Sequence, residues 1–225
     1  DKDWRREELL DDERWIFGLP PSRNANFAWI QHIIFHLAPQ GTACVAMTNS
    51  SLFATKSKEG IIRKNIIDAD LVDCIVALPP NLFFNTRIPA CLWILRKDKK
   101  NSESKKQSNE ILFINAKQMG TMITKRHREF NLKDIQIISN TYLTWKKNLS
   151  RYQNIGGFCK STSREEIIEN NYLLSPLRYV GFQSSSDSDI LSEIELNTLI
   201  SDYIEISKHA KIIDDEIINN LKKMR

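Results

Sequence analysis

The chain has 225 residues, of which 41% are hydrophobic and 27% charged, so it can form the packed core of one ordinary domain or two small ones. No apolar run approaches the length of a membrane-spanning helix, and the charged N-terminal residues do not resemble a signal peptide. The formal net charge of +4 permits a nucleic-acid partner without requiring one.

The cysteines and histidines give no metal-binding pattern. The spacings of the cysteines fit no zinc motif, and most of these residues lie inside apolar runs, so we expect reduced core cysteines and no metal site. His32 and His36 have the i, i+4 spacing of helical metal ligands, but Ile-Ile-Phe between them lacks the Glu of a zinc protease, so we interpret both as helix-surface residues. The four cysteines are Cys44, Cys74, Cys91 and Cys159.

Helices and strands are expected to alternate in the first half of the chain. Phe27, Ile30 and Ile34 share one face of a helix that Pro39 and Gly41 would end. The apolar runs that follow are short and mostly lack polar residues on either face, which is typical of strands buried in a sheet. The predicted elements are a helix over 27–37, a buried strand over 42–48, a helix over 58–69 with Ser57 as N-cap, a buried strand over 71–79 and a third strand over 90–96.

The alternation of these elements indicates an α/β sheet. Residues 110–115, EILFIN, add a fourth strand. Four strands are too few for a complete doubly wound sheet, so we expect this fold to start in its middle. Beyond residue 116 we expect no further strand.

Two segments are strongly basic. Residues 96–109, RKDKKNSESKKQSN, form either a mobile, solvated loop or a segment that contacts phosphates. Lys125, Arg126, His127 and Arg128 form the densest basic run, which is either a solvated face or a contact with the DNA backbone. Contacts of that kind make binding depend on salt without adding sequence specificity.

The region after residue 117 is expected to be helical or irregular. Asn131 can cap a helix over 132–147. Thr162, followed three residues later by Glu165, has the spacing of a capping box for another helix. Pro176 disfavours helix before it, so 172–182 is expected to be extended. The apolar side of the first of these helices is predicted to carry Leu132, Ile135, Ile138 and Tyr142.

The tail of the chain has a helical apolar stripe. After the linker SSSDSD (184–189), apolar residues recur in alternating steps of three and four. A helix of roughly 35 residues would be about 50 Å long. Little chain is left to cover such a stripe, so it needs a partner surface, either within this chain or on another protein. The residues expected to dock there are Leu196, Leu199, Tyr203, Ile206, Ile213 and Ile217.

Several blocks of the sequence, in unbroken order from Trp4 to Phe182, resemble the modification subunit of type I restriction-modification systems, an adenine-specific DNA methyltransferase. Each block alone is a modest signal, and together they are specific. The blocks are DDERWIFGLPPSRNANFAWIQHIIFHLAPQGTACVAMTNSSLF, EGIIRKNIIDADLVDCIVALPPNLFFNTRIPACLWILRK, LFINAKQMG, TYLTWKK and GFCKSTSREEIIENNYLLSPLRYVGF.

The resemblance implies a fold and a division of the chain. The fold expected is α/β, the second half of a Rossmann-like methyltransferase sheet followed by an α-helical C-terminal extension. Residues 1–117 would be the C-terminal half of the catalytic domain, 118–183 a helical or irregular extension, and 184–225 a linker with a long amphipathic helix.

The resemblance also implies a reaction, the transfer of a methyl group from S-adenosylmethionine to N6 of adenine in DNA. In the family an Asn-Pro-Pro-Phe motif and a Gly-rich cofactor loop lie upstream of the matching segment, and neither occurs in residues 1–225. We therefore expect the catalytic residues upstream of Asp1, no cofactor bound to this chain, and no activity from the chain alone.

Four residues in the first half are candidates for contact with DNA. In similar methyltransferases a loop in this half of the sheet packs an aromatic ring on the flipped base, so Phe83 and Phe84 are either that wall or anchors of the loop. Arg87 of the same loop is a candidate phosphate contact. Asn49 follows the first strand at the edge where ligands bind in open α/β sheets, and is either a rim residue or a turn former.

The resemblance implies further partners as well. These are a specificity subunit that recognises the DNA sequence, a restriction subunit and a second methyltransferase subunit, with double-stranded DNA as substrate. A prokaryotic cytoplasmic location without membrane contact is expected. Two alternatives stay open: a non-catalytic assembly or DNA-clamping module, and a methyltransferase-like fold that acts on RNA or protein.

Overall fold

The computed structural model describes residues 7–53, 58–84, 86–97, 99, 108–147 and 151–181, together with Ile204, Glu205, Ser207 and Ile213. The chain divides into two compact units, Asp1–Phe182 and Gln183–Arg225. In the second unit, the four described residues are helical and exposed. Everything that follows in this section concerns the first unit.

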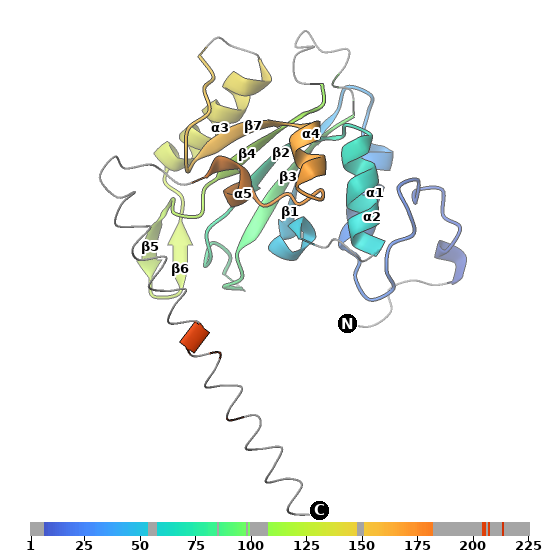
Figure 1. The fold of residues 1–225 in the computed structure, drawn as a ribbon, viewed down its shortest axis with the longest axis horizontal. Helices are drawn as coiled ribbons and strands as arrows, with labels where there is room; N and C mark the ends of the chain where they lie inside the picture. The colour runs from blue at the N-terminus through green and yellow to red at the C-terminus, as the bar shows by residue number, and fades with distance from the viewer. Residues whose placement is uncertain are drawn as a thin grey trace, which may run out of the picture. The chain divides into compact units, whose positions relative to one another are not determined.

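A mixed five-stranded sheet lies at the centre of the first unit (Figure 1). The strand order is β1-β3-β2-β4-β7, in which β1, β2 and β4 run parallel to one another while β3 and β7 are antiparallel to their neighbours. The strands are β1 (Thr42–Thr48), β2 (Val72–Ala77), β3 (Ala90–Arg96), β4 (Glu110–Asn115) and β7 (Cys159–Ser163).

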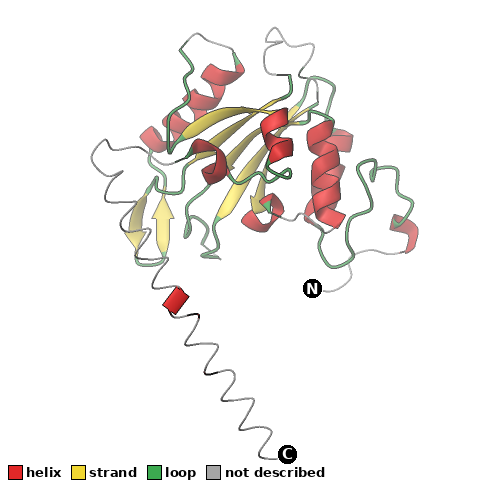
Figure 2. Ribbon diagram, viewed as in Figure 1, coloured by secondary structure: helices red, strands yellow, loops and turns green. Residues whose placement is uncertain are grey.

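Helices cover both faces of this sheet (Figure 2). One apolar core joins the sheet to α1, α2, α4 and α5, and a second, smaller core joins its other face to α3. The helices are α1 (Asn26–His36), α2 (Lys58–Asp68), α3 (Leu132–Lys146), α4 (Arg164–Glu169) and α5 (Pro176–Val180), with short 3-10 turns η1 (Glu7–Leu9) and η2 (Asn49–Leu52).

The predicted α/β class and the first four strands are confirmed. The helix predicted from residue 27 is confirmed too, with Phe27, Ile30 and Ile34 buried. The expectation that the strand over 42–48 is buried is wrong. β1 is the outer strand of the sheet, and alternate residues from Thr42 to Thr48 are exposed because α3 covers the sheet over β2 and β4 instead.

The expectation that strands end at residue 116 is also wrong. β5 (Thr121–Thr124) and β6 (His127–Glu129) form a separate antiparallel hairpin, and β7 completes the central sheet beside β4. All three are short, and the hairpin strands and most of β7 lack the alternating apolar pattern of a half-buried strand. Backbone pairing with distant segments holds them in place, and composition does not reveal such pairing.

The helix starts in this region were predicted with mixed success. The Asn131 cap is confirmed: its Oδ1 accepts from the Asp134 backbone N–H at 3.0 Å, and the Asp134 carboxylate accepts from the Asn131 N–H at 3.0 Å. The cap predicted at Thr162 is wrong by one residue, because Thr162 is a buried residue of β7 and Ser163 caps α4.

The apolar side predicted for α3 is only partly correct. Ile138 and Tyr142 pack against the second core, together with the buried Trp145. Leu132 and Ile135, in the first turn, are in contrast 77% and 50% exposed, and Ile135 borders an apolar cavity between the helix and the sheet. The apolar repeat in the sequence therefore predicted which side of α3 faces the sheet, but not how much of that side the sheet buries.

The segment 172–182 is not extended throughout, as was expected. α5 begins at Pro176, in the first helical turn, where the missing N–H of proline removes no helical hydrogen bond. Ser175, directly before it, has the extended backbone that a following proline favours.

Two residues of the basic segment 96–109 are buried, which corrects the expectation of a solvated loop for them. Arg96 is 4% exposed and pairs with Asp73, and Lys99 is 2% exposed and pairs with Asp70. Residues 98 and 100–107 lie outside the described part of the chain.

The cysteines are free, but not all of them belong to the core. Cys74, Cys91 and Cys159 are buried, whereas Cys44 is exposed on β1. Among the residues that the structure describes, no three His, Cys, Asp or Glu side chains are grouped as metal ligands would be. No described helix has the length and apolar character needed to cross a membrane.

Candidate nucleic-acid interface

The parallel strands β1, β2 and β4 all end at one edge of the sheet. Their register places Thr48 opposite Ala90, Ala77 opposite Cys91, and Ala77 opposite Asn115. This is the edge at which open α/β sheets bind ligands. The residues that follow these strands include Asn49 after β1, Phe83, Phe84 and Arg87 after β2, and Lys125, Arg126 and Arg128 after β4.

The loop after β2 directs one aromatic side chain into solvent. It leaves the sheet where the Leu78 N–H donates to the Ala90 carbonyl at 2.9 Å, and it turns back where the Thr86 N–H donates to the Phe83 carbonyl at 3.4 Å. Phe84, inside this turn, is 88% exposed, whereas Phe83 is 39% exposed. Phe84 is therefore the open aromatic surface of the loop. Arg87 is exposed as well.

The β5–β6 hairpin is attached to this loop by the backbone. The N–H of Arg128 donates to the carbonyl of Asn81 at 2.9 Å. Asn81 has a φ of 65°, a left-handed conformation that asparagine tolerates better than most residues. At the base of the hairpin Gly120 has a φ of 79°, and a Cβ there would come within 2.8 Å of the Glu129 carbonyl oxygen. Only glycine fits at that position.

The side chain of Arg128 holds the hairpin together. Its Nη1 donates to the carbonyls of Met119 at 2.9 Å and Gly120 at 3.3 Å, and the side chain is half-buried. Arg128 therefore differs from the other two basic residues predicted here, because part of its hydrogen-bonding capacity is already used inside the protein.

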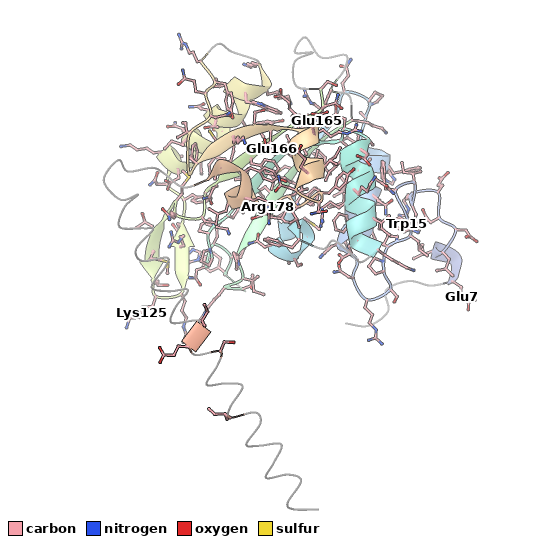
Figure 3. All side chains as sticks on the ribbon, viewed as in Figure 1. Glu7, Trp15, Lys125, Glu165, Glu166 and Arg178 are labelled. Atoms are coloured by element: carbon pink, nitrogen blue, oxygen red, sulfur yellow. The ribbon has the colours of Figure 1, made fainter. Side chains whose placement is uncertain are left out.

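Lys125 and Arg126 lie in the turn of the hairpin and are exposed; Lys125 is labelled in Figure 3. Within the described residues neither of them, nor Arg87, forms an ion pair. Cationic side chains in this state are available to a phosphate without first breaking an internal contact.

A ring contact joins the hairpin to the exposed phenylalanine. The rings of Phe84 and His127 are stacked, with centroids 4.2 Å apart and planes 18° apart. His127 also lies 3.1 Å, Nε2 to Oε1, from Glu129. In the sequence, His127 stands out only as part of a basic run. No local signal links it to Phe84, because the two residues belong to segments that are distant in the chain.

Asn49 lies at the same edge but directly after the outer strand β1, which β3 separates from β2. It opens η2, which is anchored by the buried Ser51: the Trp93 indole N–H donates to Ser51 Oγ at 3.1 Å, and Arg63 Nη1 donates to the Ser51 carbonyl at 3.1 Å. Burial lowers the pKa of Arg63 to about 10. The Oδ1 of Asn49 is buried and has no hydrogen-bond partner among the described residues.

The cavities of the described part lie away from these residues. One of ≈ 490 Å³ is walled by Trp15, Trp29 and neighbouring side chains, and an almost wholly apolar one of ≈ 280 Å³ lies between Leu92 and Tyr142. No acidic residue lines either of these two cavities, so neither offers the carboxylate that binds a ribose hydroxyl in nucleotide sites of open α/β sheets. A third cavity, of ≈ 480 Å³, is lined by Asp12, Glu13 and Arg14 beside His32. That no cofactor binds to this chain stays a prediction.

The predicted docking residues of the tail are almost all outside the described residues. Ile213 is helical and 56% exposed. The remaining ones are Leu196, Leu199, Tyr203, Ile206 and Ile217, and for them docking stays a prediction.

Residues 1–188 match the family described as N-6 DNA Methylase. The chain belongs to this family. Among N-6 DNA methylases, it is 42% identical to the type I restriction enzyme HindI methylase subunit of Haemophilus influenzae, over 98% of this chain and 48% of that protein. It is 36% identical to the type I restriction enzyme MjaIX methylase subunit of Methanocaldococcus jannaschii, over 96% of this chain and 38% of that protein. The chain thus spans half or less of the length of these relatives.

Two solved structures share the fold. The methyltransferase subunit of a type I restriction-modification system from Streptococcus thermophilus is 30% identical, with a TM-score of 0.68 over 80% of this chain and 36% of that one. The M protein of type I restriction enzyme EcoKI has a TM-score of 0.57 at 17% identity over 83% of this chain and 43% of that one, a likeness of fold alone. The resemblance found in the sequence blocks is confirmed.

Proposed function

We propose that this chain is part of an S-adenosylmethionine-dependent methyltransferase that modifies N6 of adenine in double-stranded DNA, and that it supplies the wall against which the target base stacks. One observation carries the proposal. Phe84, 88% exposed, lies at the ligand-binding edge of the sheet, in a loop tied to the hairpin that bears Lys125 and Arg126. An exposed aromatic ring beside unpaired cations suits a nucleotide that has left the duplex.

The division of labour within the enzyme follows from the chemistry of adenine. Its exocyclic amine is a weak nucleophile, because the nitrogen lone pair is delocalised into the ring, so the base has to be held in a fixed orientation. The 225 residues contain no Asn-Pro-Pro-Phe motif and no Gly-rich cofactor loop. We propose that another part of the methylase subunit binds the amine and the cofactor, and that this chain alone does not methylate DNA.

Phe84 is the better candidate for the base-stacking residue than Phe83. Both precede Arg87 in the same loop, but Phe83 is less exposed and its carbonyl closes the turn with Thr86. Lys125, Arg126 and Arg87 are proposed to contact phosphates, and Asn49 to lie at the rim of the site. Arg128 is proposed to act mainly by supporting the hairpin and to contact DNA only with the part of its guanidinium that is not used inside the protein.

For the fold we propose that the sheet is the second half of a Rossmann-like methyltransferase sheet. The parallel arrangement of β1, β2 and β4, with antiparallel β3 between two of them, supports this reading. Residues 118–183 would extend that half-sheet, and residues 184–225 would form the docking helix.

The partners proposed are those of a type I restriction-modification complex. These are a specificity subunit that recognises the DNA sequence, a restriction subunit and a second methyltransferase subunit. A prokaryotic cytoplasmic location is proposed, since chromosomal DNA is found there. Membership of a family described by DNA methylation favours DNA over RNA or protein as substrate.

The proposal is tested in the intact methylase subunit that contains this chain, assembled with its specificity subunit. Stacking of an aromatic residue on a base contributes about 1–3 kcal/mol, so Phe84→Ala should lower kcat/KM for DNA roughly 5- to 150-fold. Phe84→Tyr should stay close to the unmodified enzyme because it keeps the ring. The measurement is the initial rate of methyl transfer to a duplex whose modified adenine has been mapped.

Phe83→Ala is the matched control, one residue away in the same loop. It should lower kcat/KM less than Phe84→Ala does. Unchanged activity in Phe84→Ala would exclude the proposed stacking role.

A further inference from the structure

We infer that His127 is a positioning residue for the target base: it covers one face of the Phe84 ring and presents the other face to the adenine. The inference rests on the proposed stacking role of Phe84 and adds a residue from a different segment of the chain. It concerns how the aromatic wall is held, a question that the exposure of Phe84 raises.

An exposed phenylalanine in a loop is a poor platform by itself. Phe84 is 88% exposed, so side chains other than His127 pack little against its ring. A base that stacks on a freely rotating ring has to restrict it at the moment of binding, which lowers affinity. A platform that is already oriented avoids much of this loss.

The contact with His127 provides such orientation. The two rings are 4.2 Å apart and only 18° from parallel, a stacked arrangement that restricts both the tilt and the position of the Phe84 ring. Each planar ring has two faces. Since His127 occupies one of them, the base is assigned to the opposite, open face.

His127 is itself held from several directions. Its backbone pairs with Thr124 across the hairpin, and its Nε2 lies 3.1 Å from the Glu129 carboxylate. The next residue, Arg128, donates its N–H to the Asn81 carbonyl at the base of the Phe84 loop. The imidazole thus belongs to a hairpin that is hydrogen-bonded to the loop bearing Phe84, the residue whose ring the imidazole orients.

This arrangement also couples the two kinds of contact proposed for DNA. Lys125 and Arg126 lie in the turn that leads into β6, directly before His127. A shift of the hairpin would move the phosphate contacts and the stacking face together. Base stacking and backbone contact therefore depend on one structural unit.

The test uses the intact methylase subunit with its specificity subunit and a duplex that carries 2-aminopurine in place of the mapped target adenine. Fluorescence of this base rises when it leaves the duplex and falls when it stacks on an aromatic ring. We expect His127→Ala to weaken binding of the extrahelical base and to raise KM for unmodified DNA about 2- to 12-fold, the range that corresponds to one aromatic pair. His127→Phe, which keeps a stacked ring but loses the contact with Glu129, should stay within about twofold of the unmodified protein.

A double variant separates positioning from a general structural role. If His127 acts through Phe84, the effect of His127→Ala should disappear in a Phe84→Ala background. Additive effects of the two substitutions would overturn the inference. Where His127→Ala also lowers the thermal stability of the subunit, the fluorescence measured with His127→Phe distinguishes the two roles. A signal close to that of the unmodified protein supports positioning. A signal like that of His127→Ala overturns the inference.

The two single variants distinguish failure of the positioning role of His127 from failure of the stacking role of Phe84. Loss of activity in Phe84→Ala with normal behaviour of His127→Ala would remove His127 from the site and leave the stacking role of Phe84 intact. Normal behaviour of Phe84→Ala would remove both.

Discussion

The two ends of the central sheet use charged residues in opposite ways. At the end where β1, β2 and β4 finish, Arg87, Lys125 and Arg126 are exposed, and within the described residues they form no ion pairs. At the other end Arg96 and Lys99 are almost fully buried, each paired with an aspartate. The same residue types thus serve two purposes. Charges that are free suit a phosphate partner, whereas buried and paired charges hold strands together.

The buried cluster joins three elements of the fold. Arg96 of β3 pairs with Asp73 of β2 at 2.9 Å, and the Tyr142 hydroxyl of α3 donates to the same aspartate at 2.7 Å. Asp73 is fully buried, and burial raises the pKa of Tyr142. Because every member lies in or beside the apolar core between the sheet and α3, removing one of them leaves a charge or hydroxyl without compensation.

The first prediction concerns the buried end and has the largest expected effect. Asp73→Ala leaves the Arg96 guanidinium and the Tyr142 hydroxyl buried without their carboxylate, so the free energy of unfolding should fall by about 3–5 kcal/mol. Denaturant unfolding of the chain, followed by circular dichroism, measures the loss. The double variant Asp73→Leu with Arg96→Met, which removes both charges, should be less destabilised than Asp73→Ala.

A loss below about 1 kcal/mol in Asp73→Ala would contradict this comparison. It would mean that the cluster resembles an exposed pair in strength, and that burial does not distinguish the two ends of the sheet.

The second prediction uses two lysines that are neighbours in sequence. Lys99 Nζ donates to Asp70 at 2.8 Å and to the backbone carbonyls of Val72 at 2.5 Å and Glu110 at 3.0 Å. Burial lowers the pKa of Lys99, although Asp70 opposes this shift. Lys99→Met should lower the free energy of unfolding by about 2–3 kcal/mol, since it leaves these acceptors without their donor.

Lys97→Met is the matched control, because Lys97 is exposed and its Nζ donates to the Leu37 carbonyl at the surface. It should change stability by less than about 0.5 kcal/mol. Equal effects of the two substitutions, measured by thermal unfolding, would argue against a structural role of Lys99.

The third prediction concerns the exposed end, where the expected effect on stability is smallest. Replacing Lys125 and Arg126 together by alanine should change the free energy of unfolding by less than about 0.5 kcal/mol. If both residues neutralise phosphates, the slope of log K for DNA binding against log salt should decrease in magnitude by about 2. Fluorescence anisotropy of labelled duplex at several salt concentrations gives this slope for the intact subunit.

Lys133→Ala is the control for net charge, since Lys133 is exposed on α3. A slope that stays unchanged in the double variant, or one that changes as much in Lys133→Ala, would remove the hairpin from the DNA interface.

Much of the fold could be predicted from local patterns in the sequence. β2 and β4 are mostly apolar because both of their faces are buried, and α3 starts directly after Asn131 because its capping box is complete within four residues. β7, with its sequence CKSTS, could not be predicted in this way. It is a strand because its backbone pairs with β4, and that pairing joins segments distant in the chain.

The candidate site was predicted as separate parts. The resemblance to adenine methyltransferases drew attention to Phe83 and Phe84, and charge density drew attention to Lys125, Arg126 and Arg128. Neither signal indicated that the two segments meet. The hydrogen bond from Arg128 to Asn81 and the stacking of His127 on Phe84 bring them together.

The sequence by itself determined the family of this protein, its α/β class and the residue types that meet at the edge of the sheet. The tertiary structure decided which charges are free and which are paired, as Lys125 and Lys99 illustrate: both lie in basic segments, yet one is exposed and the other is buried against Asp70. The reason is physical. The state of a charge depends on its solvation and on its nearest partners, and in a folded chain those partners come from segments distant in the sequence.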